Sequence, residues 1–168
     1  MTKRVLIAYG SANGSTAGIA ETVARVLRED GLTAEALPAR SVTDLNPYDA
    51  VVVGGALYAG RWHRDARRFV RRYREDLAVR PVWFFSSGPL DDTASGQDLP
   101  PVPGVRKAMT RLDVREHITF GGRLAEEAGG RMARMLLRDG RGGDFRDLAA
   151  TETWAARIAG ELGGVPHG

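Results

Sequence analysis

The chain has 168 residues, of which 43% are apolar and 27% charged, a balance typical of one globular domain with a single core. It contains no cysteine, which excludes disulfides, thiolate metal sites and a cysteine nucleophile, and no apolar run approaches the length of a membrane span. The net charge is +3, and every basic residue except Lys3 and Lys107 is arginine.

The first half of the chain alternates short apolar runs with amphipathic stripes. Residues 5–9 form an apolar run that predicts a buried strand, and the apolar spacing over 16–28 predicts a helix. A weaker strand is expected at 33–37, and the β-branched run at 50–54 predicts a strongly buried one. A helix is expected over 64–77, with apolar residues on one face and arginines on the other.

The second half continues the alternation. The apolar run at 82–85 predicts a fourth strand, and the polar, proline-rich stretch 91–103 predicts a long surface loop. A short helix is expected over 105–112, a fifth strand at 117–120 and a last helix over 151–162.

Strands that are apolar on both faces, with helices between them, predict a parallel sheet covered on both sides. We expect one α/β domain spanning 1–168, built on a doubly wound five-stranded parallel sheet of order 2-1-3-4-5. Ligands of such sheets bind at the carboxyl ends of the strands where the strand order reverses, here between the first and third strands. The segments after Tyr9 and Gly54 are therefore the first candidates for a site.

The segment between the first strand and the first helix has the composition of a phosphate cradle. Its hydroxyls, its amide and the free N–H groups of the helix start can donate to an anion, and a glycine lets the backbone approach closely. The alternative is that the same residues only make a turn and cap the helix. The candidate phosphate-binding residues are Ser11, Ala12, Asn13, Gly14, Ser15 and Thr16.

Other nucleotide-binding motifs do not fit this segment. A Walker A loop needs lysine where Ser15 stands, and a dinucleotide fingerprint needs a glycine spacing different from that of Gly10, Gly14 and Gly18. A phospho-receiver domain needs an aspartate after the third strand, where Gly54 and Gly55 stand.

Five segments together resemble a known family. The loop 11–16 is similar to the FMN-phosphate signature of flavodoxins, and the resemblance continues at 48–54, 58–62, 81–90 and 142–147. The chain resembles the flavodoxin-domain branch that includes menaquinone-dependent protoporphyrinogen dehydrogenase. The resemblance implies FMN as the cofactor and a flavodoxin-like fold.

The resemblance implies two segments beside the flavin ring. One segment follows the third strand. Its aromatic residues Tyr58 and Trp62 either stack on the flavin ring or cover the edge of the core. The resemblance also implies that the peptide at Gly60 turns when the flavin is reduced. The implied binding residues of this segment are Ala56, Leu57, Tyr58, Ala59, Gly60 and Trp62. The other follows the fourth strand and lacks the aromatic residue that many flavodoxins place there, which leaves one flavin face more open. Its implied binding residues are Ser86, Ser87, Gly88, Pro89 and Leu90.

We assign no catalytic residue, because a flavin carries its own redox chemistry. His63, between Arg61 and Arg64, is either a solvated loop residue or a catalytic one. The arginine-rich segment 130–138 is either an ordinary packed helix or a peripheral membrane contact. The segment 123–143 around it is shorter than the insertion that the resemblance implies after the fifth strand.

Three functions remain open. The first is an FMN-dependent oxidoreductase that passes electrons between a small organic substrate and a quinone-type acceptor. The second is a flavodoxin-type electron carrier, and the third is a flavin-free binding or regulatory domain. The positive charge and the open flavin face favour the first, because family carriers are typically acidic. We expect a cytoplasmic location and no nucleic-acid partner; the oligomeric state is left open.

Overall fold

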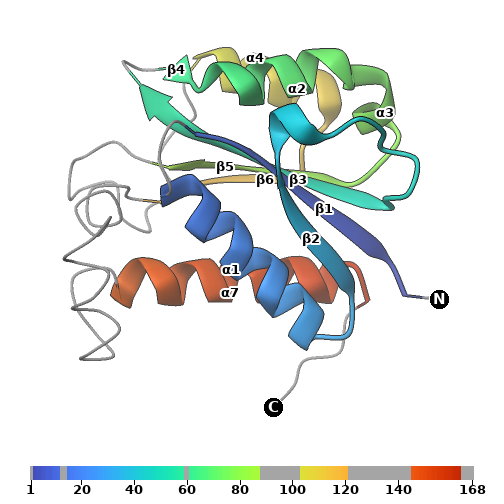
Figure 1. Cartoon of the computed structure of the whole chain (residues 1–168), viewed down its shortest axis with the longest axis vertical. Helices are drawn as coiled ribbons and strands as arrows, with labels where there is room; N and C mark the ends of the chain where they lie inside the picture. The colour runs from blue at the N-terminus through green and yellow to red at the C-terminus, as the bar shows by residue number, and fades with distance from the viewer. Residues whose placement is uncertain (1, 12–14, 59–60, 88–102, 121–144, 164–168) are drawn as a thin grey trace.

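The computed structural model describes residues 2–11, 15–58, 61–87, 103–120 and 145–163. Five parallel strands form its central sheet, in the order β2-β1-β3-β5-β6 (Figure 1). Counted along the chain, this is the predicted order 2-1-3-4-5. The strands are β1 (Arg4–Gly10), β2 (Thr33–Pro38), β3 (Ala50–Tyr58), β5 (Val82–Ser87) and β6 (Glu116–Phe120).

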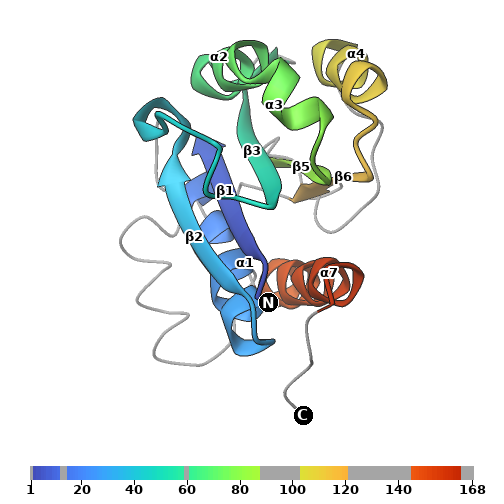
Figure 2. The ribbon, with the colours of Figure 1, turned by 90° about the vertical axis from the view of Figure 1, so that its right-hand side faces the viewer.

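Helices cover both faces of the sheet, as Figures 1 and 2 show. One layer consists of α1 (Ser15–Glu29) and α7 (Phe145–Glu161), which lie side by side. The other consists of α2 (Arg64–Arg72), α3 (Arg74–Ala78) and α4 (Pro103–Leu112). A short 3₁₀ turn, η1 (Ala39–Ser41), follows β2. Among the helices that the structure describes, none is both long and apolar enough to cross a bilayer.

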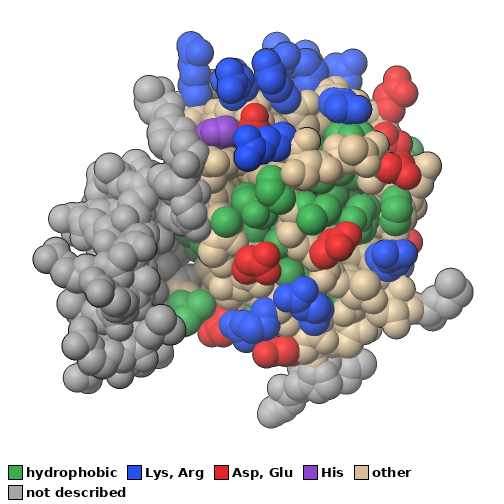
Figure 3. Space-filling model, viewed as in Figure 1, with side chains coloured by type: hydrophobic (Ala, Val, Ile, Leu, Met, Phe, Trp, Pro, Cys, Tyr) green, Lys and Arg blue, Asp and Glu red, His purple; other side chains and the backbone are tan. Residues whose placement is uncertain are grey.

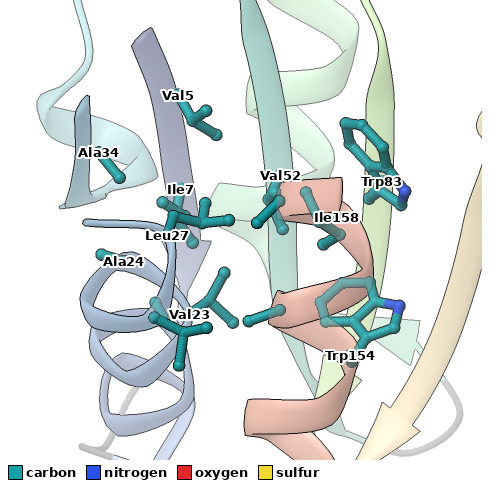
Figure 4. Close-up of a cluster of buried hydrophobic side chains, with 14 of the residues drawn as sticks. Val5, Ile7, Val23, Ala24, Leu27, Ala34, Val52, Trp83, Trp154 and Ile158 are labelled. Atoms are coloured by element: carbon teal, nitrogen blue, oxygen red, sulfur yellow. The ribbon is translucent and has the colours of Figure 1, made fainter. Parts of the chain in front are cut away.

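The core is divided by the sheet into two buried clusters, which explains why the strands are apolar on both faces. Figure 4 shows part of the first cluster, between the sheet and the α1/α7 layer. Val23 and Leu27 of α1 meet Trp154 and Ile158 of α7 there, over the strands. The second cluster lies under α2, α3 and α4 and includes Phe69, Tyr73 and Leu77, which the helical spacing had placed on one face.

Three predicted boundaries were wrong. The helix expected over 64–77 is two helices, because Tyr73 leaves helical geometry (φ −104°, ψ 23°) where its buried hydroxyl donates to the carbonyl oxygen of Val42 at 2.8 Å. The last helix begins at Phe145, before the apolar stripe that predicted it. The third strand continues past Gly54 to Tyr58, because it gains a partner that its own sequence does not reveal.

That partner is β4 (Arg61–Trp62), which pairs antiparallel with the end of β3. Leu57 faces Trp62 and Tyr58 faces Arg61 in this hairpin. The segment predicted as a loop after the third strand is therefore largely strand. Most of the expected loop 91–103, and the basic segment 130–138, lie outside the described residues.

Candidate cofactor-binding site

The register of the sheet brings the predicted site segments to one edge. Gly10 of β1 pairs with Gly55 of β3, and Gly55 pairs in turn with Ser86 of β5. Parallel strands end at the same edge of a sheet, so the chain following each of these residues leaves the sheet at neighbouring points. The structure thus places Ser11, Ala56 and Ser87 together at the carboxyl edge, as the sequence predicted.

Thr16 is the last residue of the candidate phosphate loop. It lies in the first turn of α1 and is completely buried. Within the described part of the chain its hydroxyl oxygen, Oγ1, has no hydrogen-bond partner. A buried hydroxyl without a partner costs free energy in a protein, and a ligand oxygen would remove that cost.

The position of this hydroxyl fits a phosphate group. The first N–H groups of a helix have no partner within the helix, and they carry the positive end of its dipole. Thr16 Oγ1 adds a donor at that end, directly after the strand at the switch point. Ser11 is half-buried at the end of β1 and Ser15 starts the helix, whereas Ala12, Asn13 and Gly14 lie outside the described residues.

The end of β1 is also in close contact with the start of α2. A Cβ atom on Gly10 would lie 2.7 Å from the backbone nitrogen of Ala66 and 3.2 Å from His63 Nδ1. Only glycine allows this approach, so Gly10 lets a second helix begin beside the phosphate loop, on the other face of the sheet. This role of Gly10 was not predicted.

His63 is the N-cap of α2. Its Nδ1 accepts a hydrogen bond from the backbone N–H of Asp65 at 3.1 Å, and its side chain is only 17% exposed. Histidine is an unusual cap, which is why the sequence suggested a solvated or catalytic residue instead. The structure gives His63 a structural role at the start of the helix.

Trp62 covers the edge of the core. It is 3% exposed, its ring lies 4.9 Å from that of Phe84, and a Cβ atom on Gly55 would come within 2.8 Å of it. Of the two alternatives for this side chain, the structure shows the packing one. Stacking on a flavin stays a prediction for Tyr58; Ala59 and Gly60 lie outside the described residues.

A buried polar network joins three strands just beneath the site. The indole N–H of Trp62 donates to Ser86 Oγ at 3.0 Å, and the same oxygen lies 2.8 Å from His117 Nε2. Ser86 is 1% exposed and His117 7%. The bond from Trp62 ties the β3–β4 hairpin to β5, so one buried hydroxyl links the two segments expected beside the ring.

Sequence reasoning missed this network, although it left a signal. Ser86, His117 and Thr119 are polar residues at buried strand positions. The register puts all three on the face of the sheet that α2 and α4 cover. Ser87 is also buried, at 3% exposure, whereas Gly88, Pro89 and Leu90 lie outside the described residues.

Fold and site together define a flavodoxin-like α/β domain with a candidate anion site at its switch point. A family model described as "Flavodoxin domain" matches residues 6–139. The chain belongs to the flavodoxin-domain family.

Solved structures agree with this assignment at the level of the fold. A cysteine-to-serine mutant of a flavodoxin from Pseudomonas aeruginosa is 22% identical, with a TM-score of 0.66 and coverage of 96% of this chain and 99% of that one. Oxidised flavodoxin 1 from Bacillus cereus is 15% identical, with a TM-score of 0.62 and coverage of 94% and 97%. Rubredoxin oxygen:oxidoreductase from Desulfovibrio gigas is 16% identical, with a TM-score of 0.66; the match covers 96% of this chain but 36% of that larger protein. No curated protein matches the sequence.

Proposed function

We propose that this chain is an FMN-dependent redox protein that holds the flavin phosphate at the start of α1. The buried, unpartnered hydroxyl of Thr16 carries the proposal. The family supports FMN rather than another phosphate ligand, because flavodoxin-like domains bind that cofactor at this edge of the sheet.

The chain's own residues would bind and orient the flavin. Residues 11–16 would hold the phosphate through hydroxyl and backbone N–H groups, without a lysine or arginine in the loop. The β3–β4 hairpin and the segment after Ser87 would flank the ring, and the Ser86 network would fix the distance between them. When bound, FMN supplies the capacity to accept and release electrons.

The role in electron transfer is the finer part of the proposal. We favour an oxidoreductase similar to protoporphyrinogen dehydrogenase, with a small organic substrate and a quinone-type acceptor, over a carrier that serves other proteins. The net charge of +3 supports this choice, because it differs from the acidic character of family carriers. The carrier is the second candidate function. It is supported by the similarity of this chain's fold to flavodoxins over nearly the whole length of those proteins.

Thr16→Val tests the phosphate site. The variant keeps the shape of the side chain and removes the hydroxyl, and a hydrogen bond to a charged group contributes roughly 1.5–3 kcal/mol, so the FMN dissociation constant should rise about tenfold or more. The flavin-free protein should lose no stability, because valine removes a buried polar atom that has no partner among the described residues. Flavin fluorescence quenching measures the first quantity and thermal unfolding the second.

Thr22→Val on the same helix is the matched control. Its hydroxyl is bonded to the carbonyl of Gly18 at 3.0 Å, so FMN affinity should not change. A chain that takes up no FMN at all would refute the cofactor. If Thr16→Val binds FMN as tightly as the parent protein, the flavin phosphate accepts no hydrogen bond from the Thr16 hydroxyl.

Two assays of the flavin-loaded protein separate the enzyme from the carrier. The enzyme should oxidise protoporphyrinogen with menadione as the acceptor. Turnover only in cytochrome reduction through a flavodoxin reductase would favour the carrier.

A further inference from the structure

Among the helices that the structure describes, positive charge is concentrated on one layer. In α2 and α3, Arg64, Arg67, Arg68, Arg71, Arg72 and Arg74 stand against three acidic residues, and α4 has three cations and no acid. The opposite layer is balanced: α1 has two cations and two acids, and α7 has two cations and three acids. We call the exposed cations of α2, α3 and α4 the arginine face; Figure 3 shows them gathered along that edge of the molecule.

The two layers also differ in what their arginines contact. On the balanced side, Arg25 pairs with Glu29 and Glu152, and Arg157 pairs with Glu116. Within the described ranges, no arginine from Arg64 to Arg74 forms a salt bridge with an acid of this chain. Among the described acids, therefore, none forms an ion pair that neutralises Arg64 to Arg74, and this leaves their charge to act on an external anion.

The arginine face begins at the candidate cofactor site. The backbone of Ala66 in the first turn of α2 lies against Gly10, at the end of β1, and Arg64 starts the same turn. A partner bound over α2 would therefore reach the carboxyl edge of the sheet, where the flavin is proposed to lie.

The composition of this face indicates a protein partner. Guanidinium groups match carboxylates and phosphates alike with two parallel hydrogen bonds, so the choice between partners depends on what else the face presents. Among the described residues the large exposed apolar side chains are Val79, just beyond α3, and Leu148, on the other layer. A membrane surface would be bound more firmly with apolar side chains to insert, whereas a polar, charged face suits a transient complex with an oppositely charged protein.

We propose that the arginine face docks an acidic redox protein beside the flavin, so that this chain exchanges electrons with a partner whose charge is opposite to its own. The inference rests on the proposed FMN-dependent redox function; it keeps the small organic substrate of the favoured enzyme and puts an acidic redox protein in the place of the quinone-type acceptor. Each transfer moves one electron between the flavin and the partner's own redox centre, so one is oxidised as the other is reduced.

Binding of purified, FMN-loaded protein to two probes of opposite charge tests the proposal. We expect an acidic plant-type ferredoxin to bind, with amide NMR shifts confined to α2, α4 and the carboxyl edge, and basic cytochrome c not to bind. Because exposed charges are screened by salt, raising the ionic strength to about 0.3 M should weaken the ferredoxin complex about tenfold or more.

Two charge-reversal variants of equal net charge locate the surface. Arg68→Glu/Arg71→Glu should weaken ferredoxin binding about tenfold, because both residues are exposed on α2. Lys3→Glu/Arg4→Glu lowers the net charge equally at the opposite edge of the sheet, and it should change binding less than about twofold. If the reversal on α2 impairs folding, Arg68→Gln/Arg71→Gln should show a smaller loss in the same direction.

The other polyanions serve as competing outcomes. Tighter binding to vesicles of phosphatidylcholine and phosphatidylglycerol, or to duplex DNA, than to ferredoxin would overturn the proposal, as would equal sensitivity to the two reversals. FMN titration of the same samples keeps the two proposals apart. If the protein binds FMN but not ferredoxin, the proposed function stands and the docking inference is wrong. If it binds ferredoxin but not FMN, the arginine face is a docking surface and the proposed cofactor is wrong.

Discussion

At the scale of single residues, small side chains decide how closely the elements of the site pack. A Cβ atom on Gly54 would lie 2.0 Å from Cζ of Phe85, so the ring of Phe85 occupies the space that any other residue would need. Gly55 does the same for Trp62 on the opposite face of β3. From the sequence, these glycines argue against a phospho-receiver and mark the predicted end of the third strand. Their steric partners follow only from the pairing of β3 with β5 and with β4.

Gly54→Ala should destabilise the protein by about 3 kcal/mol or more, because overpacking a filled core forces side chains and backbone to move. Phe85→Leu should restore part of this loss in the double variant, giving a favourable coupling energy. Gly160→Ala is the matched control: nothing lies within 4 Å of its added methyl group in α7, and it should stabilise the protein by about 0.5–1 kcal/mol. Urea unfolding measures all four proteins, and additive losses from Gly54→Ala and Phe85→Leu would contradict the steric explanation.

At the scale of elements, the local pattern located the strands and helices but not the contacts that end them. The apolar run of the third strand predicted an end at Gly54, yet pairing with β4 extends it to Tyr58. The turn at Tyr73 likewise divides one amphipathic stripe into α2 and α3 while both keep their apolar face on the sheet. The first difference arises from a hairpin partner, β4, which begins three residues after β3 ends. The second is associated with the bond from Tyr73 to Val42, 31 positions away in the chain.

Ser86→Ala tests the network that joins β4 to the sheet. Removing the shared hydroxyl leaves the buried indole N–H of Trp62 without its acceptor, so the variant should lose about 1–3 kcal/mol of unfolding free energy. In a Trp62→Phe background the same substitution should cost clearly less, since one of the two partners is already absent. If Ser86→Ala costs the same unfolding free energy in both backgrounds, measured by urea unfolding, the bond from Trp62 contributes nothing to the stabilising effect of the Ser86 hydroxyl.

At the scale of the whole molecule, the last helix and the first strand contribute side chains to the same buried cluster. Trp154 of α7 is fully buried, with ring centroids 6.0 Å from Phe85 and 5.8 Å from Phe120. Its indole N–H donates to Glu116 Oε1 at 2.9 Å, at the start of β6. These contacts connect α7 to strands β5 and β6, and α7 also packs against α1, so we expect the chain to unfold as one cooperative unit.

Trp154→Ala should therefore cost about 3–5 kcal/mol, with the signals of secondary and tertiary structure lost in a single shared transition. Leu148→Ala on the same helix should cost less than about 0.5 kcal/mol, because that side chain is 44% exposed. Far- and near-ultraviolet circular dichroism follow the two signals. Separate transitions would mean that α7 docks on a sheet that is stable without it.

The sequence by itself determined the parallel sheet, its strand order and the place of the segment 11–16 at the carboxyl edge, because apolar periodicity and glycine- and hydroxyl-rich turns are local properties of the chain. The binding of a phosphate there stays a prediction. Only the tertiary structure decided that Trp62 covers the core, that His63 caps a helix, and that Ser86 and His117 share a hydrogen bond. The roles of Trp62, Ser86 and His117 depend on residues 24 and 31 positions apart that the fold brings together. The cap at His63 is local, but it depends on where α2 begins, and that start is packed against Gly10. The arginine face lies between the two cases: its arginines are plain in the sequence, but their lack of salt bridges with acids in the described residues is a property of the fold.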